Sequence, residues 1–230
     1  MGILDTFSTH EKTVLIVFII GCPDSMHGTK IGSVNQALRK VSPMLEDHSS
    51  IYDFEFKIAV LKYSTGCEWM QNEPKTSSEF QSINLKAGGK AELGSAFLEL
   101  NNKLSTEQFI KLFRNYAPPV LILFSDCDPT DDYQSGLKKL KENRWYKAAL
   151  KIAVYIGSDA NIEVLKDFTN SWESVIELHN IKKINTLIAG HIKNYDSDSS
   201  LPKDSDWGNS NRGKLNNMKK YEQVILRLLI

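Results

Sequence analysis

An uninterrupted apolar run near the start of the chain is the feature that most limits its possible folds. Residues Thr13 to Ile20, TVLIVFII, carry no charge, and only the first of them is polar. A strand with one face in water alternates polar and apolar residues, so this continuous pattern indicates a strand that is covered on both faces. Val120 to Phe124, VLILF, shows the same pattern. We therefore expect the centre of a parallel sheet with helices on both sides.

Strand-like runs recur along the chain and mostly alternate with helical patterns. The runs are Thr13–Ile20, Phe54–Tyr63, Phe80–Leu85, Pro119–Ser125, Leu150–Gly157 and Ser174–Leu178. No helical pattern separates the second run from the third, so one edge strand should be antiparallel. The expected fold class is a doubly wound, Rossmann-like α/β domain, with a mostly parallel six-stranded sheet, one antiparallel edge strand and helices on both faces.

Helical periodicity is clearest in two apolar stripes, which are Ile31, Val34, Leu38, Val41 and Leu45, and then Leu93, Phe97, Leu100 and Leu104. Pro43 should kink or shorten the first of these helices, because proline lacks the N–H that the helix needs. STEQFIKLF should open another helix, with Ser105 as N-cap and Gln108 completing a capping box. Residues 131–143, 161–169 and 181–192 predict three more helices.

The composition changes after Lys193. We expect a domain over residues 1–193 and a flexible polar linker over residues 194–217, which are rich in Asp, Ser, Asn and Gly. Residues 218–230, MKKYEQVILRLLI, predict an amphipathic helix with apolar residues on one face. The sequence leaves open whether this helix docks on its own domain or on a partner.

Charge and cysteine content restrict the setting in which the chain works. Lys plus Arg and Asp plus Glu are equal at 28 each, which disfavours nucleic acid and acidic membrane surfaces as partners. No apolar run is long enough for a membrane span, and the first residues do not resemble a signal peptide. Three cysteines without CxxC spacing argue against a secreted disulfide framework. The sequence therefore predicts a cytoplasmic protein.

Residue patterns typical of enzymes are missing. The five histidines are scattered, and no nucleophile elbow or HExxH motif is present. AGGKAELG contains glycines and a lysine but does not match a phosphate-binding loop, and GCPDSMHG does not match a dinucleotide fingerprint. We therefore expect a chain without enzymatic activity and without a cofactor.

Three segments give a more specific indication: FIIGCPDSMHGTKIGSVNQAL, AGGKAELGSAFLELNNKL and APPVLILFSDCDPTDDY. Together they resemble a von Willebrand factor A-type domain, in particular the small bacterial intracellular kind associated with tellurium resistance and stress signalling. The resemblance covers roughly residues 12–193 and implies a protein–protein interaction module. In such domains a D-x-S-x-S loop, a threonine and a later aspartate form a metal-ion-dependent adhesion site. Oxygen ligands of this kind suit Mg²⁺, and the partner's carboxylate completes its shell.

This sequence departs from that pattern at most of the ligand positions. Gly21 stands where the resemblance implies the leading aspartate, Pro23 replaces the first serine, and Ala91 replaces the threonine. Only Ser25 and Asp126 keep an oxygen-bearing side chain. The resemblance therefore implies a degenerate site that has lost its metal ion. Lys90, next to Ala91, is a candidate to supply the missing positive charge to a partner's carboxylate.

The leading hypothesis is a module that binds a partner protein at the loops following the strands, without a bridging ion. The candidate partner-binding residues are Asp24, Ser25, Lys90, Glu92, Asp126 and Asp128. One alternative is a structural subunit of a larger stress or signalling assembly, held by the helix at residues 218–230. In a second alternative Ser25, Asp126 and Asp24 form a rebuilt site for Mg²⁺ or Mn²⁺. Less expected is a redox pair or soft-metal site of Cys22 and Cys127. The partner's identity and the oligomeric state stay open.

Overall fold

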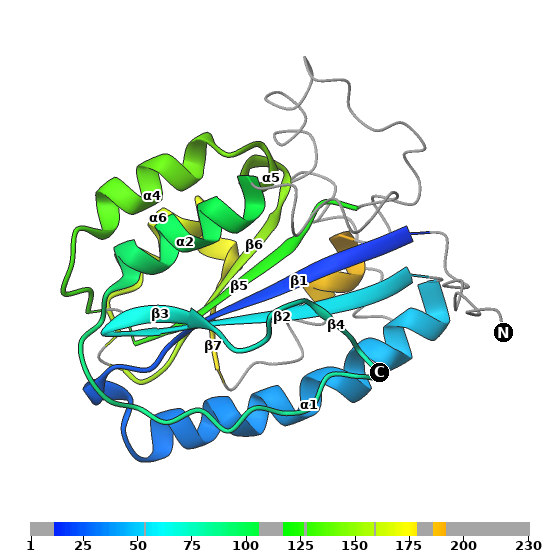
Figure 1. The fold of residues 1–230 in the computed structure, drawn as a ribbon, viewed down its shortest axis with the longest axis horizontal. Coiled ribbons are helices and arrows are strands. Elements are labelled where there is room, and N and C mark those ends of the chain that lie inside the picture. Colours follow the sequence, from blue (N-terminus) through cyan, green and yellow to red (C-terminus); the bar gives the residue numbers. More distant parts are fainter. Residues whose placement is uncertain are drawn as a thin grey trace, which may run out of the picture.

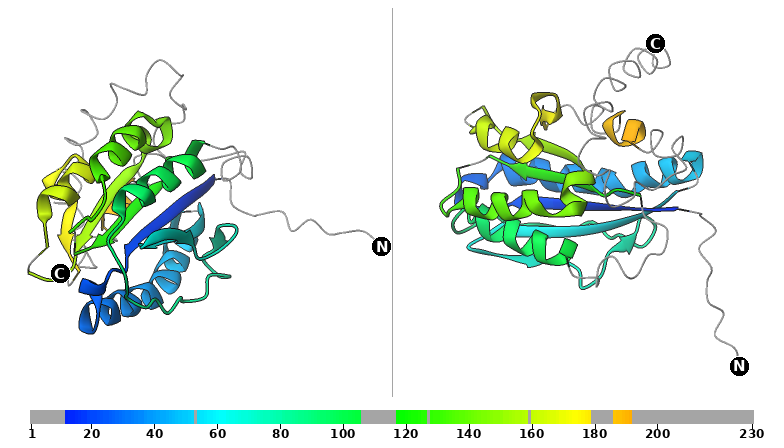
Figure 2. Two further views of the ribbon diagram at one scale, coloured as in Figure 1. Left: turned by 60° about the vertical axis from the view of Figure 1, so that its left-hand side comes forward. Right: turned by 90° about the horizontal axis from the view of Figure 1, so that it is seen from above.

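A computed structural model of the protein describes residues 12–52, 54–105, 117–126, 128–158, 160–178 and 186–191. Its described part is a three-layer α/β arrangement, in which a central sheet lies between α1 (Thr29–Tyr52) on one face and a second group of helices on the other (Figure 1). The second group comprises α2 (Leu93–Ser105), α4 (Tyr133–Glu142), α5 (Arg144–Ala148) and α6 (Ile162–Thr169). The views in Figure 2 show the same separation of α1 from α2 and α4.

The sheet has the strand order β3-β2-β1-β5-β6-β7, and a short β4 also pairs with β2. The strands are β1 (Lys12–Gly21), β2 (Phe54–Ser64), β3 (Gly66–Trp69), β4 (Lys75–Thr76), β5 (Val120–Ser125), β6 (Leu150–Tyr155) and β7 (Val175–Glu177). The pairs β1–β2, β1–β5, β5–β6 and β6–β7 are parallel, whereas β3 and β4 pair antiparallel with β2. The mostly parallel sheet with an antiparallel edge is therefore confirmed. The number of strands was wrong: the described residues form seven strands rather than six, because β3 and β4 both pair antiparallel with β2.

The continuous apolar run of β1 reflects burial on both faces. Val14, Ile16, Phe18 and Ile20 belong to the cluster beneath α1. The alternate residues Leu15, Val17 and Ile19 belong to the cluster beneath α2, α4 and α6. The two predicted helical stripes, on α1 and α2, are buried in these same clusters. Because β1 lies between β2 and β5 in the strand order, its carboxyl end lies in the middle of one edge of the sheet.

The antiparallel edge strand was predicted at the wrong place. Phe80–Leu85 is not a strand; the edge is formed by β3, which begins at Gly66, a residue with a φ of 73°. Phe80 and Leu85 are nevertheless buried. The side chain of Asn35, on α1, donates to the carbonyl of Leu85 at 2.9 Å and accepts from its amide at 2.8 Å. These bonds replace the strand partner that an apolar run would otherwise need.

Pro43 does not shorten α1, which continues to Tyr52. Val41 and Leu45 on either side of the proline are buried against the sheet. This packing holds the helix together where a backbone hydrogen bond is lost.

Two glycines bring α2 and α4 unusually close together. A Cβ atom on Gly94 would lie 2.6 Å from the backbone oxygen of Asp132, and one on Gly136 would lie 2.6 Å from the backbone oxygen of Gly94. Both positions therefore need a residue without a side chain. The close approach fixes the start of α4 relative to α2, and both helices begin next to the loops at the carboxyl edge of the sheet.

Several sequence predictions concern residues outside the described ranges. These are most of the helix opened by Ser105, the linker at 194–217, the helix at 218–230 and Cys127. Ser105 itself is the last residue of α2, and residues 186–191 are helical. Among the described helices, none has the length and apolar character that crossing a membrane requires.

Candidate functional site

Three loops meet at the carboxyl edge of the sheet: residues 22–28 after β1, residues 88–92 before α2, and residues 128–132 after β5. The amide of Asp24 donates to the carbonyl of Gly89 at 2.9 Å, and the amide of Gly88 donates to the carbonyl of Cys22 at 2.8 Å. The amide of Thr130 donates to the carbonyl of Ala91 at 2.9 Å. Main-chain bonds therefore join all three loops into one surface, which we call the carboxyl-edge surface.

Asp126, the aspartate directly after β5, faces a lysine. Its side chain is buried, and the residue is 5% exposed. The Nζ atom of Lys30, in the first turn of α1, lies 3.2 Å from Asp126 Oδ2. Asp126 Oδ1 is buried and has no hydrogen-bond partner among the described residues. The ammonium of Lys30 is thus the positive charge that compensates this buried carboxylate.

The space beside Gly21 is filled by an aromatic ring. A Cβ atom on Gly21 would lie 2.7 Å from the Oη atom of Tyr63 and 2.9 Å from its Cζ atom. Tyr63 is 1% exposed, and its hydroxyl donates to Ser125 Oγ at 2.8 Å. A carboxylate side chain at position 21 therefore has no room unless the tyrosine moves.

The residues present do not fit the metal site that the resemblance implies. Gly21, Pro23 and Ala91 have no side-chain oxygen, and Pro23 and Ala91 are buried in the loops. A divalent ion beside Asp126 would also lie close to the Lys30 ammonium. At about 4 Å and an effective dielectric of 20, repulsion between a monovalent and a divalent cation costs roughly 8 kcal/mol. Among the described residues no cluster of His, Cys, Asp or Glu is suited to holding a metal ion.

The acidic residues after β5 serve mainly as helix caps. Asp131 accepts from the amides of Gly94 and Ser95, both at 2.9 Å, so it caps the start of α2. Asp132 accepts from the amide of Ser135 at 3.1 Å and caps α4. Hydrogen bonds from the side chain and then from the amide of Ser135 lower the pKa of Asp132. Asp132 therefore initiates the helix that follows it in the sequence, whereas Asp131 caps α2, which precedes it.

The other candidate residues differ in their exposure. Asp24, Ser25, Lys90 and Asp128 are exposed on the carboxyl-edge surface. The Oδ1 atom of Asp24 lies 3.6 Å from His27 Nε2, and both side chains are exposed. Glu92 is half-buried and accepts from the amide of Gly66 at 2.8 Å, which ties α2 to the β2–β3 turn. Asp126 lies beneath the exposed residues rather than among them.

Burial shifts the pKa of two titratable side chains, Cys22 and Lys151. Burial raises the pKa of the Cys22 thiol to about 12, and its Sγ atom lies 3.8 Å from the carbonyl of Ile20. This environment disfavours the thiolate that redox or soft-metal chemistry requires. Burial lowers the pKa of Lys151 to about 8, while its Nζ donates to the carbonyls of Tyr146 and Ala149 at 2.9 and 2.8 Å. Lys151 thereby closes the carboxyl end of α5.

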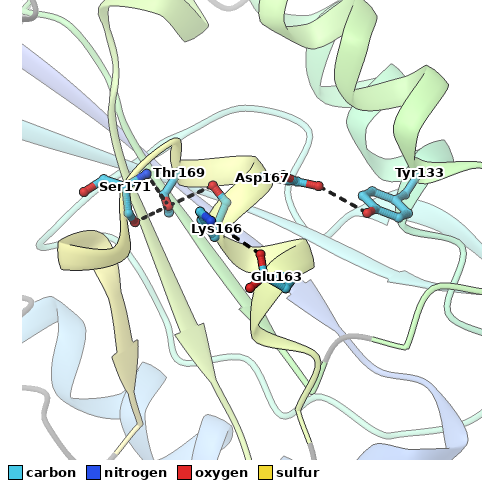
Figure 3. A network of polar contacts seen from close by, with 6 residues as sticks. All are labelled: Tyr133, Glu163, Lys166, Asp167, Thr169 and Ser171. Carbon is cyan, nitrogen blue, oxygen red and sulfur yellow. Dashed lines mark hydrogen bonds and ion pairs between the residues drawn. The ribbon is translucent and has the colours of Figure 1, made fainter.

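A polar network next to the carboxyl-edge surface fixes the position of α6 (Figure 3). Tyr133, the first residue of α4, donates to Asp167 Oδ2 at 3.3 Å. At the end of α6, Thr169 Oγ1 donates to the carbonyl of Ser171 at 2.7 Å and accepts from its amide at 3.2 Å. These short-range contacts close the helix around a left-handed Asn170.

Lys30 and Tyr63 are the two important residues that the sequence reading did not identify. A signal for Lys30 was available, because a lysine in the first turn of a helix is unfavourable beside the positive end of the helix dipole. Such a residue needs a compensating contact elsewhere. Tyr63 gave no comparable signal, since a tyrosine at the end of a buried strand is ordinary.

Sequence comparison gives no relative: no protein-family model matches the chain, and no curated protein matches it. Solved structures do share its fold. The pilus adhesin SpaC from Lactobacillus rhamnosus GG has a TM-score of 0.60 and 13% identity over 80% of this chain. VWA2, the ArnB paralog from Sulfolobus acidocaldarius, has a TM-score of 0.51 and 20% identity over 77% of it. BatB from Bacteroides thetaiotaomicron has a TM-score of 0.52 and 10% identity over 80% of it.

The extent of these matches limits what they show. The chain spans only 30% of SpaC and 44% of VWA2, whereas it spans 100% of BatB. At such low identities the likeness establishes the fold and nothing finer. The sheet order, the helical layers and these structural relatives agree with the resemblance read from the sequence. The chain therefore has a von Willebrand factor A-like fold.

Proposed function

We propose that this chain is a non-enzymatic protein-interaction module that binds a partner protein at the carboxyl-edge surface without a bridging metal ion. The observation that carries the proposal is the set of main-chain hydrogen bonds between the three loops, with distances of 2.8 and 2.9 Å. Loops joined in this way lose little conformational entropy when a partner binds. The fold also supports the proposal, because the carboxyl edge of a parallel sheet is where such folds place their binding sites.

The exposed side chains give this surface a mixed charge. Asp24 and Asp128 are acidic and Lys90 is basic, and all three are exposed. A partner with a complementary arrangement of charges fits such a surface, with a carboxylate opposite Lys90. The backbone of Lys90 is anchored, since its amide donates to Thr65 Oγ1 at 3.0 Å. Its ammonium extends from an anchored loop.

The contacts of the aspartates favour binding without a metal over a rebuilt Mg²⁺ or Mn²⁺ site. Asp126 faces Lys30, and Asp131 and Asp132 accept from the amides of helix starts. Ser25 and Asp24 remain exposed, and neither replaces the missing inner ligands. From the sequence resemblance we propose a cytoplasmic role in bacterial stress signalling.

The proposal is tested by affinity capture with the immobilised full chain in the presence of EDTA. Wild type is expected to retain a partner under these conditions. The variants Lys90→Glu and Asp24→Lys should lose it, because each reverses a charge on the carboxyl-edge surface. The matched control is Lys138→Glu, which makes the same change as Lys90→Glu at an exposed position on α4. This control should retain the partner.

Two outcomes contradict the proposal. Capture that needs added Mg²⁺ or Mn²⁺ contradicts a site without a metal, and full capture by both loop variants contradicts the assignment of the surface. Removal of residues 195–230 separates this proposal from the structural-subunit alternative. A chain that binds through the loops keeps its partner after this deletion, whereas a chain held by the segment at 218–230 loses it.

A further inference from the structure

Asp126 carries a buried carboxylate whose charge needs compensation within the fold. It follows β5 directly and is 5% exposed, so its carboxylate is largely removed from water. An ionised carboxylate in such a place is unfavourable unless an opposite charge or hydrogen bonds compensate it. Within the described residues Oδ1 has no hydrogen-bond partner. The compensation seen at this side chain therefore comes through Oδ2.

Lys30 supplies that compensation from a position where a lysine is locally unfavourable. Its Nζ lies 3.2 Å from Asp126 Oδ2, and its side chain is 21% exposed. Lys30 is the second residue of α1, and the first turn of this helix contains no acidic residue. The positive end of the helix dipole disfavours a cation there. A residue that conflicts with local preference and pairs with a buried carboxylate is best explained by that pairing.

The neighbouring tyrosine removes the space for a second carboxylate. The ring of Tyr63 fills the volume beside Gly21, and its hydroxyl donates to Ser125 Oγ at 2.8 Å. Among the residues that the structure describes, the site therefore pairs one buried carboxylate with one ammonium, and the formal charges of these two groups cancel. A divalent ion would add charge to a pair that is already neutral.

We propose that Lys30 is the built-in cation of the carboxyl-edge surface, with its ammonium taking the place that a divalent ion holds in an adhesion site of this fold. The surface then keeps one form whether or not divalent ions are present. This inference rests on the proposed function for the role of the surface. Its chemistry, however, is tested on the isolated chain, so that either proposal can fail without the other.

The experiment measures the melting temperature of the chelator-treated full chain with and without millimolar Mg²⁺ or Mn²⁺. Wild type should show no ion-dependent shift. Lys30→Met, which removes the charge and keeps the aliphatic stem, should melt about 5 °C or more lower, because it leaves the carboxylate unpaired. Mn²⁺ should restore part of this loss, since the ion can then occupy the place of the ammonium. The double variant Lys30→Met/Asp126→Asn should lose that response.

Two controls separate cation replacement from an ordinary ion pair. Arg39→Met removes a positive charge from an exposed position on the same helix and should behave like wild type. Lys30→Arg keeps the charge and should remain insensitive to the ions. If Lys30→Met does not fold, the double variant is expected to fold, because it removes both charges together.

Four results overturn the inference. The first is a wild-type shift with Mg²⁺ or Mn²⁺ that Asp126→Asn abolishes, and the second is an unchanged melting temperature in Lys30→Met. The third is a destabilised Lys30→Met that no ion restores, which would leave only an ion pair of ordinary kind. The fourth is a failure of both Lys30→Met and the double variant to fold. A loss of partner binding in the capture experiment, by contrast, leaves the inference intact.

Discussion

Adding a single methyl group at Gly21 tests whether the Tyr63 ring fills the space beside this residue. In Gly21→Ala the new Cβ would lie 2.7 Å from Tyr63 Oη and 2.9 Å from Cζ. Both distances are shorter than carbon contacts in proteins allow. The ring is 1% exposed and hydrogen-bonded to Ser125, so it cannot swing into solvent. The variant must therefore push buried atoms apart.

The expected cost combines two opposing effects. Overpacking a well-packed core typically costs about 1–3 kcal/mol. Replacing glycine by alanine also lowers the conformational entropy of the unfolded chain, which stabilises the folded state by about 0.4–1 kcal/mol. The free energy of unfolding should therefore fall by about 1–2 kcal/mol. For a chain of this size, that lowers the melting temperature by about 2–8 °C.

Urea unfolding followed by circular dichroism measures this change. Gly32→Ala is the matched control, because Gly32 lies inside α1 and its Cβ would meet nothing within 4 Å. That control should raise the free energy of unfolding, by up to about 1 kcal/mol, through helix propensity. In a Tyr63→Leu background the cost of Gly21→Ala should largely disappear. A Gly21→Ala variant as stable as wild type would refute the reasoning.

Three further substitutions are tested by the same unfolding assay: two near the carboxyl-edge surface, and one at Lys151 near the start of β6. Asp131→Ala removes the cap of α2 and should cost about 1–2 kcal/mol, whereas Asp128→Ala, at an exposed position, should cost little; equal effects would contradict the cap. Gly136→Ala places a Cβ 2.6 Å from the backbone oxygen of Gly94 and should cost about 2 kcal/mol or more; a neutral result would exclude so close a helix crossing. Lys151 has its pKa lowered by burial from 10.5 to about 8, so between these values the unfolded state binds more protons than the folded state and stability rises with pH. Relative to Lys151→Met, wild type should therefore gain up to about 3 kcal/mol between pH 8 and pH 10.5, and a constant difference across this window would contradict the shifted pKa.

Much of the fold was predictable because burial on two faces leaves a clear pattern. The apolar runs at β1 and β5 and the stripe on α1 depend on spacing alone. The false strand at Phe80–Leu85 shows the limit of that reading. Its apolar residues are buried as expected, but Asn35 on a distant helix takes the backbone hydrogen bonds. No local pattern encodes a contact between positions so far apart in the sequence.

The sequence shows which residues of the candidate site have no side-chain oxygen, but not which residue contacts Asp126. Positions 21, 23 and 91, where the resemblance implies metal ligands, hold glycine, proline and alanine. Lys90 was the natural candidate for the compensating charge, because it adjoins one of these positions in the sequence. Lys30 takes that role toward Asp126, since the start of α1 folds back over the end of β5. The contact between Lys30 and Asp126 depends on the path of the chain through the loop after β1, which the sequence pattern does not specify.

The central claim is that the carboxyl-edge surface works without a divalent ion. Isothermal titration calorimetry of the chelator-stripped full chain with Mg²⁺ and then Mn²⁺, beside Asp126→Ala, tests this claim most directly. No binding heat from either protein up to millimolar ion is the predicted result. Saturable heat at sub-millimolar ion in wild type, absent in Asp126→Ala, would show that an ion binds at Asp126 despite Lys30, and it would contradict the account.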